Sequence, residues 1–97
     1  DVLGLAEIKD VAKVELKPAY PNPSHGITCI PVSFSKNMLG SIKLLDVIGK
    51  EVLVIYNGDF QMGEKNFFIN SLNLSKGAYI ISIETSEGKF TQKLMVQ

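Results

Sequence analysis

An ordered series of turn signals divides this sequence along its whole length. The signals are Pro21, Asn22 and Pro23 followed by Gly26, then Asp46 with Gly49, then Gly77 before Tyr79, and then Gly88. Proline fixes φ and donates no hydrogen bond to a strand ladder, and glycine adopts the positive φ that tight turns need. Only short segments remain between these signals. We therefore expect short strands rather than long helices.

The segments between the turns alternate apolar and polar residues with the period of two that is typical of a half-buried strand. The predicted strands cover residues 12–17, 27–34, 41–44, 52–56, 65–69, 79–85 and 90–96, with loops at 35–40 and 57–63. Pro31 is expected to mark a sheet edge or a bulge. The hairpin turns predicted at Asp46 to Gly49 and at Glu87-Gly88 make neighbouring strands antiparallel. The sequence predicts an all-β fold, an immunoglobulin-like antiparallel β-sandwich of about seven strands.

Two turns carry more detailed predictions. The side chain of Asp46 is expected to accept backbone hydrogen bonds inside the turn that ends at Gly49. Tyr79 follows Gly77 and opens the penultimate strand, as in a tyrosine corner, although a core aromatic with its hydroxyl at the rim is the simpler alternative. By alternation, the partly buried aromatics are Phe34, Tyr56, Phe67, Phe68, Tyr79 and Phe90.

Length and charge restrict the class of protein. Ninety-seven residues with 45% hydrophobic content form one domain with one core. We assign residues 1–11 to a linker or the end of a preceding domain, and residues 12–97 to the sandwich. The ten basic and ten acidic residues cancel, and the chain contains no arginine. Since arginine is the usual residue for bidentate phosphate and base recognition, we expect no nucleic-acid partner.

The residues that could carry chemistry are few. His25 and Cys29 are the only imidazole and the only thiol, and an extended chain places them about 13 Å apart, too far for proton transfer. A zinc site needs three or four ligands, and no close run of carboxylates suits calcium. The sequence therefore predicts a protein that is not an enzyme and that has neither a metal site nor a cofactor.

The order of the motifs resembles a known family. The Pro21-Asn22-Pro23-x-x-Gly26 loop is followed by GSIKLLDVIGKEV, Gly63-Glu64, SLNLSKGAYIISI and the closing GKFTQKLMVQ. This order resembles the type A C-terminal sorting domain of cargo proteins of the type IX (Por) secretion system, over about residues 16–97. Such an address ends its chain, and we expect the same of Gln97.

The resemblance implies a non-catalytic secretion signal attached to the C-terminal side of a cargo protein. The implied partners are the outer-membrane translocon with its shuttle components, and a gingipain-like sortase that removes the domain. The cargo would pass through the periplasm and then be secreted or held at the cell surface. Cleavage would fall within residues 1–16.

The family's signal lies largely near the C-terminus, so the resemblance implies recognition by the translocon there. The implied recognition residues are Lys89, Thr91, Lys93, Leu94, Met95, Val96 and Gln97. The implied structural positions are Pro21, Asn22, Pro23, Gly26, Asp46, Gly49, Gly77 and Tyr79. With Leu94 and Val96 facing the core, we expect the last strand to offer a partner a backbone edge for strand addition.

Two other interpretations remain open. Lys89 and Lys93 also suit a solvated edge strand of a passive spacer or adhesin module, because edge lysines block aggregation. A carbohydrate-binding module would instead need exposed aromatics on a sheet face, for which Tyr20 and Phe60 are the candidates.

Overall fold

The computed structural model describes residues 13–97. The segment predicted as a linker at 1–11, Ala12, and all but the last four positions of the expected cleavage region lie outside the described residues. Within these residues, the strands are β1 (Val14–Leu16), β2 (Ile27–Phe34), β3 (Met38–Asp46), β4 (Glu51–Phe60), β5 (Gly63–Asn70), β6 (Gly77–Thr85) and β7 (Gly88–Val96), and the 3-10 turn η2 (Ser71–Asn73) precedes β6.

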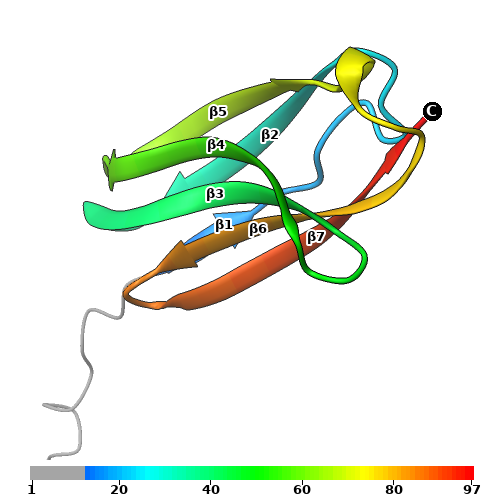
Figure 1. Cartoon of the computed structure of the whole chain (residues 1–97). Coiled ribbons are helices and arrows are strands. Elements are labelled where there is room, and N and C mark those ends of the chain that lie inside the picture. The colour runs from blue at the N-terminus through cyan, green and yellow to red at the C-terminus, as the bar shows by residue number, and fades with distance from the viewer. Residues whose placement is uncertain (1–12) are drawn as a thin grey trace, which may run out of the picture.

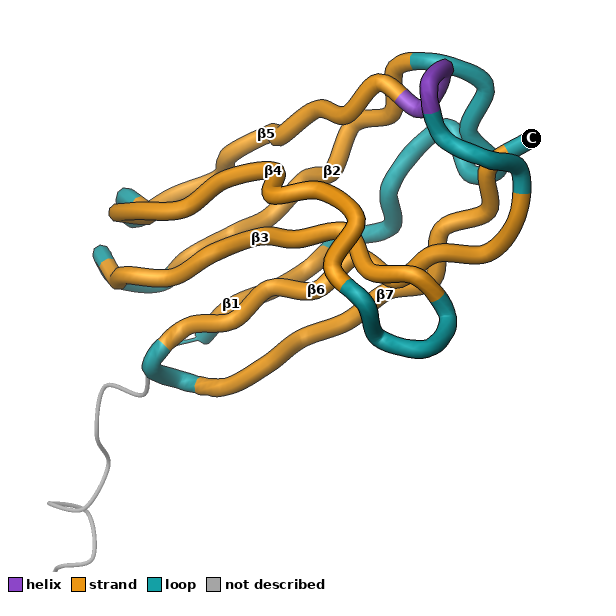
Figure 2. Tube along the Cα trace, in the orientation of Figure 1, coloured by secondary structure: helices purple, strands orange, loops and turns teal. Residues whose placement is uncertain are grey.

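The strands form two sheets that lie face to face (Figure 1). One sheet has three strands in the order β1-β2-β5, and the other has four in the order β4-β3-β6-β7. Each neighbouring pair within a sheet is antiparallel. The predicted antiparallel β-sandwich is confirmed, and Figure 2 shows that loops join the strands at both ends.

The core consists of the inward-facing side chains of both sheets. They include Ile30, Val32 and Phe34 of β2, Ile42 and Leu44 of β3, Ile81 and Ile83 of β6, and Leu94 and Val96 of β7. These residues are spaced two apart along each strand, because successive side chains of a strand point to opposite faces. The period of two in the sequence therefore predicted these core positions correctly.

Two of the predicted loops are partly strand. β3 begins at Met38, and β4 continues through Asn57 and Gly58 to Phe60. Gly40 and Gly58 are opposite each other in this pairing. A Cβ on Gly40 would lie 2.2 Å from the carbonyl oxygen of Glu84, so glycine is needed here for close packing against β6 rather than for a turn.

The expectations for Phe60 and Phe68 were both wrong. Phe60 is 1% exposed because the longer β4 carries it into the core opposite Met38, whereas Phe68 is 60% exposed. Phe67 packs against the core. Because neighbours in a strand face opposite sides of the sheet, Phe68 points outward.

Pro31 lies in β2, the central strand of its sheet, so the expected edge or bulge was wrong. The strand tolerates proline because β1 ends at Leu16, just before the position opposite Pro31. The Lys17 N–H still donates to the Pro31 carbonyl at 3.0 Å. The Lys17 carbonyl, which a regular ladder would pair with an N–H at position 31, accepts instead from the side chain of Gln92 at 2.8 Å.

The turn before β7 lies one residue earlier than expected. It consists of Ser86 and Glu87, and Gly88 is already opposite Thr85 in the ladder. A primed hairpin turn (type I′ or II′) at Glu87-Gly88 would need a positive φ at Glu87, its first central residue. Among residues 13–97, only glycines have positive φ, and Gly88 has 134°.

Both detailed turn predictions are confirmed. Asp46 Oδ1 accepts hydrogen bonds from the N–H groups of Ile48 at 3.1 Å and Lys50 at 2.8 Å, and Gly49 has φ 89°. The Tyr79 hydroxyl donates to the Ser75 carbonyl at 2.7 Å. This bond joins Tyr79 in β6 to the end of the connection that crosses from β5 of one sheet to β6 of the other, as in a tyrosine corner.

Candidate functional site: the C-terminal strand

The predicted recognition residues lie on β7 and just after it, at the edge of the four-stranded sheet. Leu94 is 0% exposed and Val96 is 2% exposed, so both are core residues. The side chains that point outward are exposed at Lys89, Thr91, Lys93 and Gln97 and half-buried at Met95. A partner that approaches the folded domain can therefore contact these five side chains but not Leu94 or Val96.

The outer backbone edge of β7 is covered over its last residues by the loop that contains Asn22 and Ser24. The Asn22 side chain donates to the Lys93 carbonyl at 3.0 Å and accepts from the Met95 N–H at 3.0 Å. The Ser24 N–H donates to the Met95 carbonyl at 2.7 Å, and the Gln97 N–H donates to the Ser24 carbonyl at 3.0 Å. Over residues 93–97, the backbone edge expected to be available to a partner is therefore already occupied.

A buried group of hydroxyls holds this loop in place. Ser24, Thr28 and Ser71 are buried, although they come from the loop, β2 and η2. The Thr28 hydroxyl lies 2.5 Å from the Ser24 hydroxyl, which lies 2.7 Å from the Ser71 hydroxyl. The Gly26 N–H donates to the Ser71 hydroxyl at 3.0 Å. Since a buried hydroxyl is costly to leave unpaired, these bonds favour a single position of the loop.

The side chain of Gln92 links β7 to the segment that follows β1. Its Oε1 accepts from the Ala19 N–H at 2.7 Å, and its Nε2 donates to the Lys17 carbonyl at 2.8 Å. Gln92 lies between Phe90 and Leu94 on the inward-facing side of the strand. The sequence analysis did not identify this role, for which the signal is a polar residue at an inward-facing position of an otherwise apolar face.

A family model described as the secretion system C-terminal sorting domain matches residues 18–97. The chain belongs to this family. Membership implies a type IX secretion system and an attached cargo protein that is secreted or held at the cell surface. Sorting domains of this family are in general non-catalytic. No curated protein and no solved structure matches the chain.

The matched region of the sorting domain includes the loop around Asn22 and Ser24, the three buried hydroxyl residues that hold this loop, and all of β7. The loop and the final strand therefore occur within one family pattern. Their hydrogen bonds help to hold the last strand in the sheet. The roles of the individual recognition residues remain predictions.

Charged groups of the sorting domain form two surface ion pairs among the described residues. Lys17 pairs with Glu64, and Lys43 with Glu51. The hydrogen bond from Lys17 lowers the pKa of the Glu64 carboxyl and raises the pKa of the Lys17 amine. A lowered carboxyl pKa adds stability above the pH at which an unfolded glutamate titrates, and this is lost as the pH falls through the folded pKa. Because both groups are exposed, the effect is small.

The exposed aromatics of the sorting domain lie on the outer face of the three-stranded sheet. Tyr20 and Phe68 are both opposite Cys29 in the pairing, one on each side of it. A hydrogen bond with Cys29 raises the pKa of the Tyr20 phenol. Phe60, the second aromatic expected for a carbohydrate platform, is buried and cannot contact a ligand there.

The sequence analysis considered His25 and Cys29 as residues that could carry chemistry. Cys29 is a free, buried thiol in β2, and His25 is exposed in the loop that precedes this strand. Across residues 13–97, no group of three or more His, Cys, Asp or Glu residues could hold a metal ion. In the same part of the chain, no helix is long and apolar enough to cross a membrane.

Replacing Asn22 by alanine should loosen the end of β7. The variant loses the hydrogen bonds to the Lys93 carbonyl and from the Met95 N–H, which should cost about 1–2 kcal/mol of unfolding free energy. Urea unfolding gives the stability, and amide exchange should become faster at Met95. In the control His25→Ala, an exposed side chain of the same loop is removed and both Asn22 bonds remain, so exchange at Met95 should stay slow. Equal protection of Met95 in Asn22→Ala would contradict the proposed contact.

Proposed function

We propose that this domain directs an attached cargo protein from the periplasm through the outer-membrane translocon of the type IX system, and that a gingipain-like sortase then removes it. The family match over residues 18–97 is the observation that carries this proposal. In the proposed mechanism, translocon and shuttle components contact the exposed side chains of β7 in the folded domain. The cut then falls within residues 1–16, before or at the first strand.

The outer face of β7 is suited to such a contact. Lys89, Thr91 and Lys93 are alternate residues of one strand and are exposed on the same face. Beside them, a surface depression of about 400 Å³ is lined by Val47, Ala78, Tyr79, Ile80, Thr91, Gln92 and Lys93. An apolar floor with lysine at its margin offers a partner both surface to bury and charge to orient it.

Export of a reporter fused to the whole chain tests this proposal in a bacterium with a type IX system. A fusion without the domain should stay inside the cell. The double variant Lys89→Ala/Lys93→Ala should reach the surface about tenfold less, the effect of losing about 1.4 kcal/mol of binding. The matched control is Lys50→Ala/Lys65→Ala, because these lysines are also exposed but lie in the loop before β4 and in β5.

The same cultures distinguish the proposal from its alternatives. Mass spectrometry of the surface protein should show a new C-terminus within residues 1–16, which reports removal by the sortase. A domain that persists on the mature protein, together with unchanged export of the β7 variants, would instead favour a spacer or adhesin module.

A further inference from the structure

The two halves of β7 differ in how their outer backbone groups are paired. Residues whose backbone points toward β6 alternate with residues whose backbone points away. Lys93, Met95 and Gln97 belong to the second set, because their outer groups bond to Asn22 and Ser24. By the same alternation, the N–H and C=O groups of Lys89 and Thr91 also point away from β6. No hydrogen bond from the rest of residues 13–97 reaches these groups.

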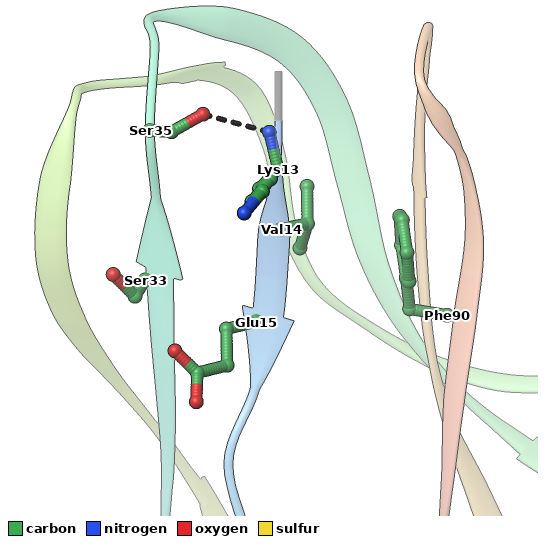
Figure 3. A pocket seen from close by; sticks show the side chains of 6 residues that line it. All are labelled: Lys13, Val14, Glu15, Ser33, Ser35 and Phe90. Carbon is green, nitrogen blue, oxygen red and sulfur yellow. Dashed lines mark hydrogen bonds between the residues drawn. The ribbon is translucent and has the colours of Figure 1, made fainter. Parts of the chain in front are cut away.

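A groove runs beside this unpaired half of the strand. It has a volume of about 560 Å³ and is lined by Lys13, Val14, Glu15, Ser33, Ser35 and Phe90. Figure 3 shows Val14 of β1 and Phe90 of β7 on facing sides of the groove, with the polar side chains toward β2. Val14 and Phe90 are only half-buried, although both pack against the core. The groove therefore combines apolar walls with an unpaired strand edge.

We propose that the unpaired edge of β7 at Lys89 and Thr91 is a strand-addition site for an extended segment of the type IX translocon, whose apolar side chain enters the groove between Val14 and Phe90. This inference rests on the proposed function and specifies which surface the translocon binds. The strand edge is already used in this way further along, where Asn22 and Ser24 bond its backbone groups. A partner segment would continue that pairing toward the turn at Ser86 and Glu87.

The lysine side chains along this edge of β7 indicate which residues a partner segment would need. Lys89 and Lys93 are exposed on either side of Thr91, so two copies of this edge would bring lysines together and repel each other. A segment with acidic or polar residues facing the lysines, and an apolar residue facing the groove, would be attracted instead. The edge therefore favours a different protein over a second copy of this chain.

The substitution Thr91→Pro tests the backbone contact directly. The Thr91 N–H points away from β6, so proline removes one outer donor but no bond of the β6–β7 ladder, and proline is tolerated at such edge positions. The matched control Thr91→Val changes the side chain and keeps the N–H. We expect the fused reporter to reach the surface about tenfold less with Thr91→Pro than with Thr91→Val, the effect of losing one partner hydrogen bond. Thermal unfolding of the purified whole chain checks that both variants fold.

Amide exchange of the unmodified chain gives a second measurement. The Thr91 N–H should exchange quickly, whereas the Met95 and Gln97 N–H groups should be protected by Asn22 and Ser24. A Thr91 N–H as protected as that of Met95 would mean that the edge is already paired, which would overturn the proposal. Equal export of Thr91→Pro and Thr91→Val would also overturn it.

Two further controls separate the possible failures. If Thr91→Pro does not fold, Lys89→Pro takes its place, with Lys89→Ala as its control, because the Lys89 N–H also points away from β6. If the unmodified fusion itself is not exported, the proposed function fails and the named partner with it. If that fusion is exported and each proline variant is exported as well as its own matched control, only the strand-addition site fails.

Discussion

Removal of residues 93–97 is expected to unfold the sorting domain as well as to stop export of its cargo. Leu94 and Val96 are fully buried, and burial of each such side chain contributes about 1.5–3 kcal/mol. The deletion also removes the groups that Asn22 and Ser24 bond. A small domain is stable by only about 5–15 kcal/mol in total, so the truncated chain should lose its cooperative thermal transition and become sensitive to protease.

This expectation affects how a truncation can be interpreted. A shortened domain that fails in export has lost its fold, so the failure does not show which residues the translocon contacts. The variant Lys89→Ala/Lys93→Ala separates the two effects, because exposed substitutions change stability by only about 0.5 kcal/mol. A truncated domain that melts at the unmodified temperature would contradict the structural role of Leu94 and Val96.

Phe60→Ala is expected to be one of the most destabilising single substitutions, and Phe68→Ala to be nearly neutral. The Phe60 ring stacks on Phe34 with 4.4 Å between centroids and meets Phe67 edge-on at 5.9 Å. Loss of a buried phenylalanine costs about 3–5 kcal/mol. The melting temperature should therefore fall by more than about 10 °C, since a domain of this size loses about 4–8 °C per kcal/mol.

Phe68→Ala is the matched control because it removes the same side chain from an exposed position of β5. Differential scanning calorimetry of both variants gives the comparison. Equal losses would mean that the alternation in β5 or the extent of β4 is wrong. A larger loss for Phe68 would restore the arrangement that the sequence pattern predicted.

Local sequence patterns predicted much of the fold. The strands around Ile42, Ile81 and Leu94 face the core as their alternation indicates. The hydrogen bonds of Asp46 lie within four residues of it, and that of Tyr79 joins it to Ser75. Such features depend on neighbours along the chain, so the sequence contains the information needed to predict them. The order of these motifs was also enough to indicate the family.

The wrong predictions at Gly40 and Pro31 involve residue types that occur at more than one kind of structural position. Gly40 was interpreted as part of a loop, but it is needed where the backbone of β6 comes close. Pro31 suggested an edge, but it is tolerated in a central strand because β1 ends beside it. In both cases the deciding neighbour belongs to another strand, and its position cannot be inferred from the residues nearby in the sequence.

For the candidate site, too, local sequence patterns indicated part of the structure, and contacts between distant segments determined the rest. From the sequence, the final strand could be located, its inward and outward side chains assigned, and its recognition role proposed by resemblance. Its backbone edge depends on contacts between distant parts of the chain: Asn22 meets Lys93 across 71 residues, and Gln92 meets Lys17 across 75. Alternation specifies which face a side chain takes, but it contains no information about which segment lies beside an edge strand. Packing of the two sheets places the loop against the end of β7 and leaves Lys89 and Thr91 unpaired among the described residues.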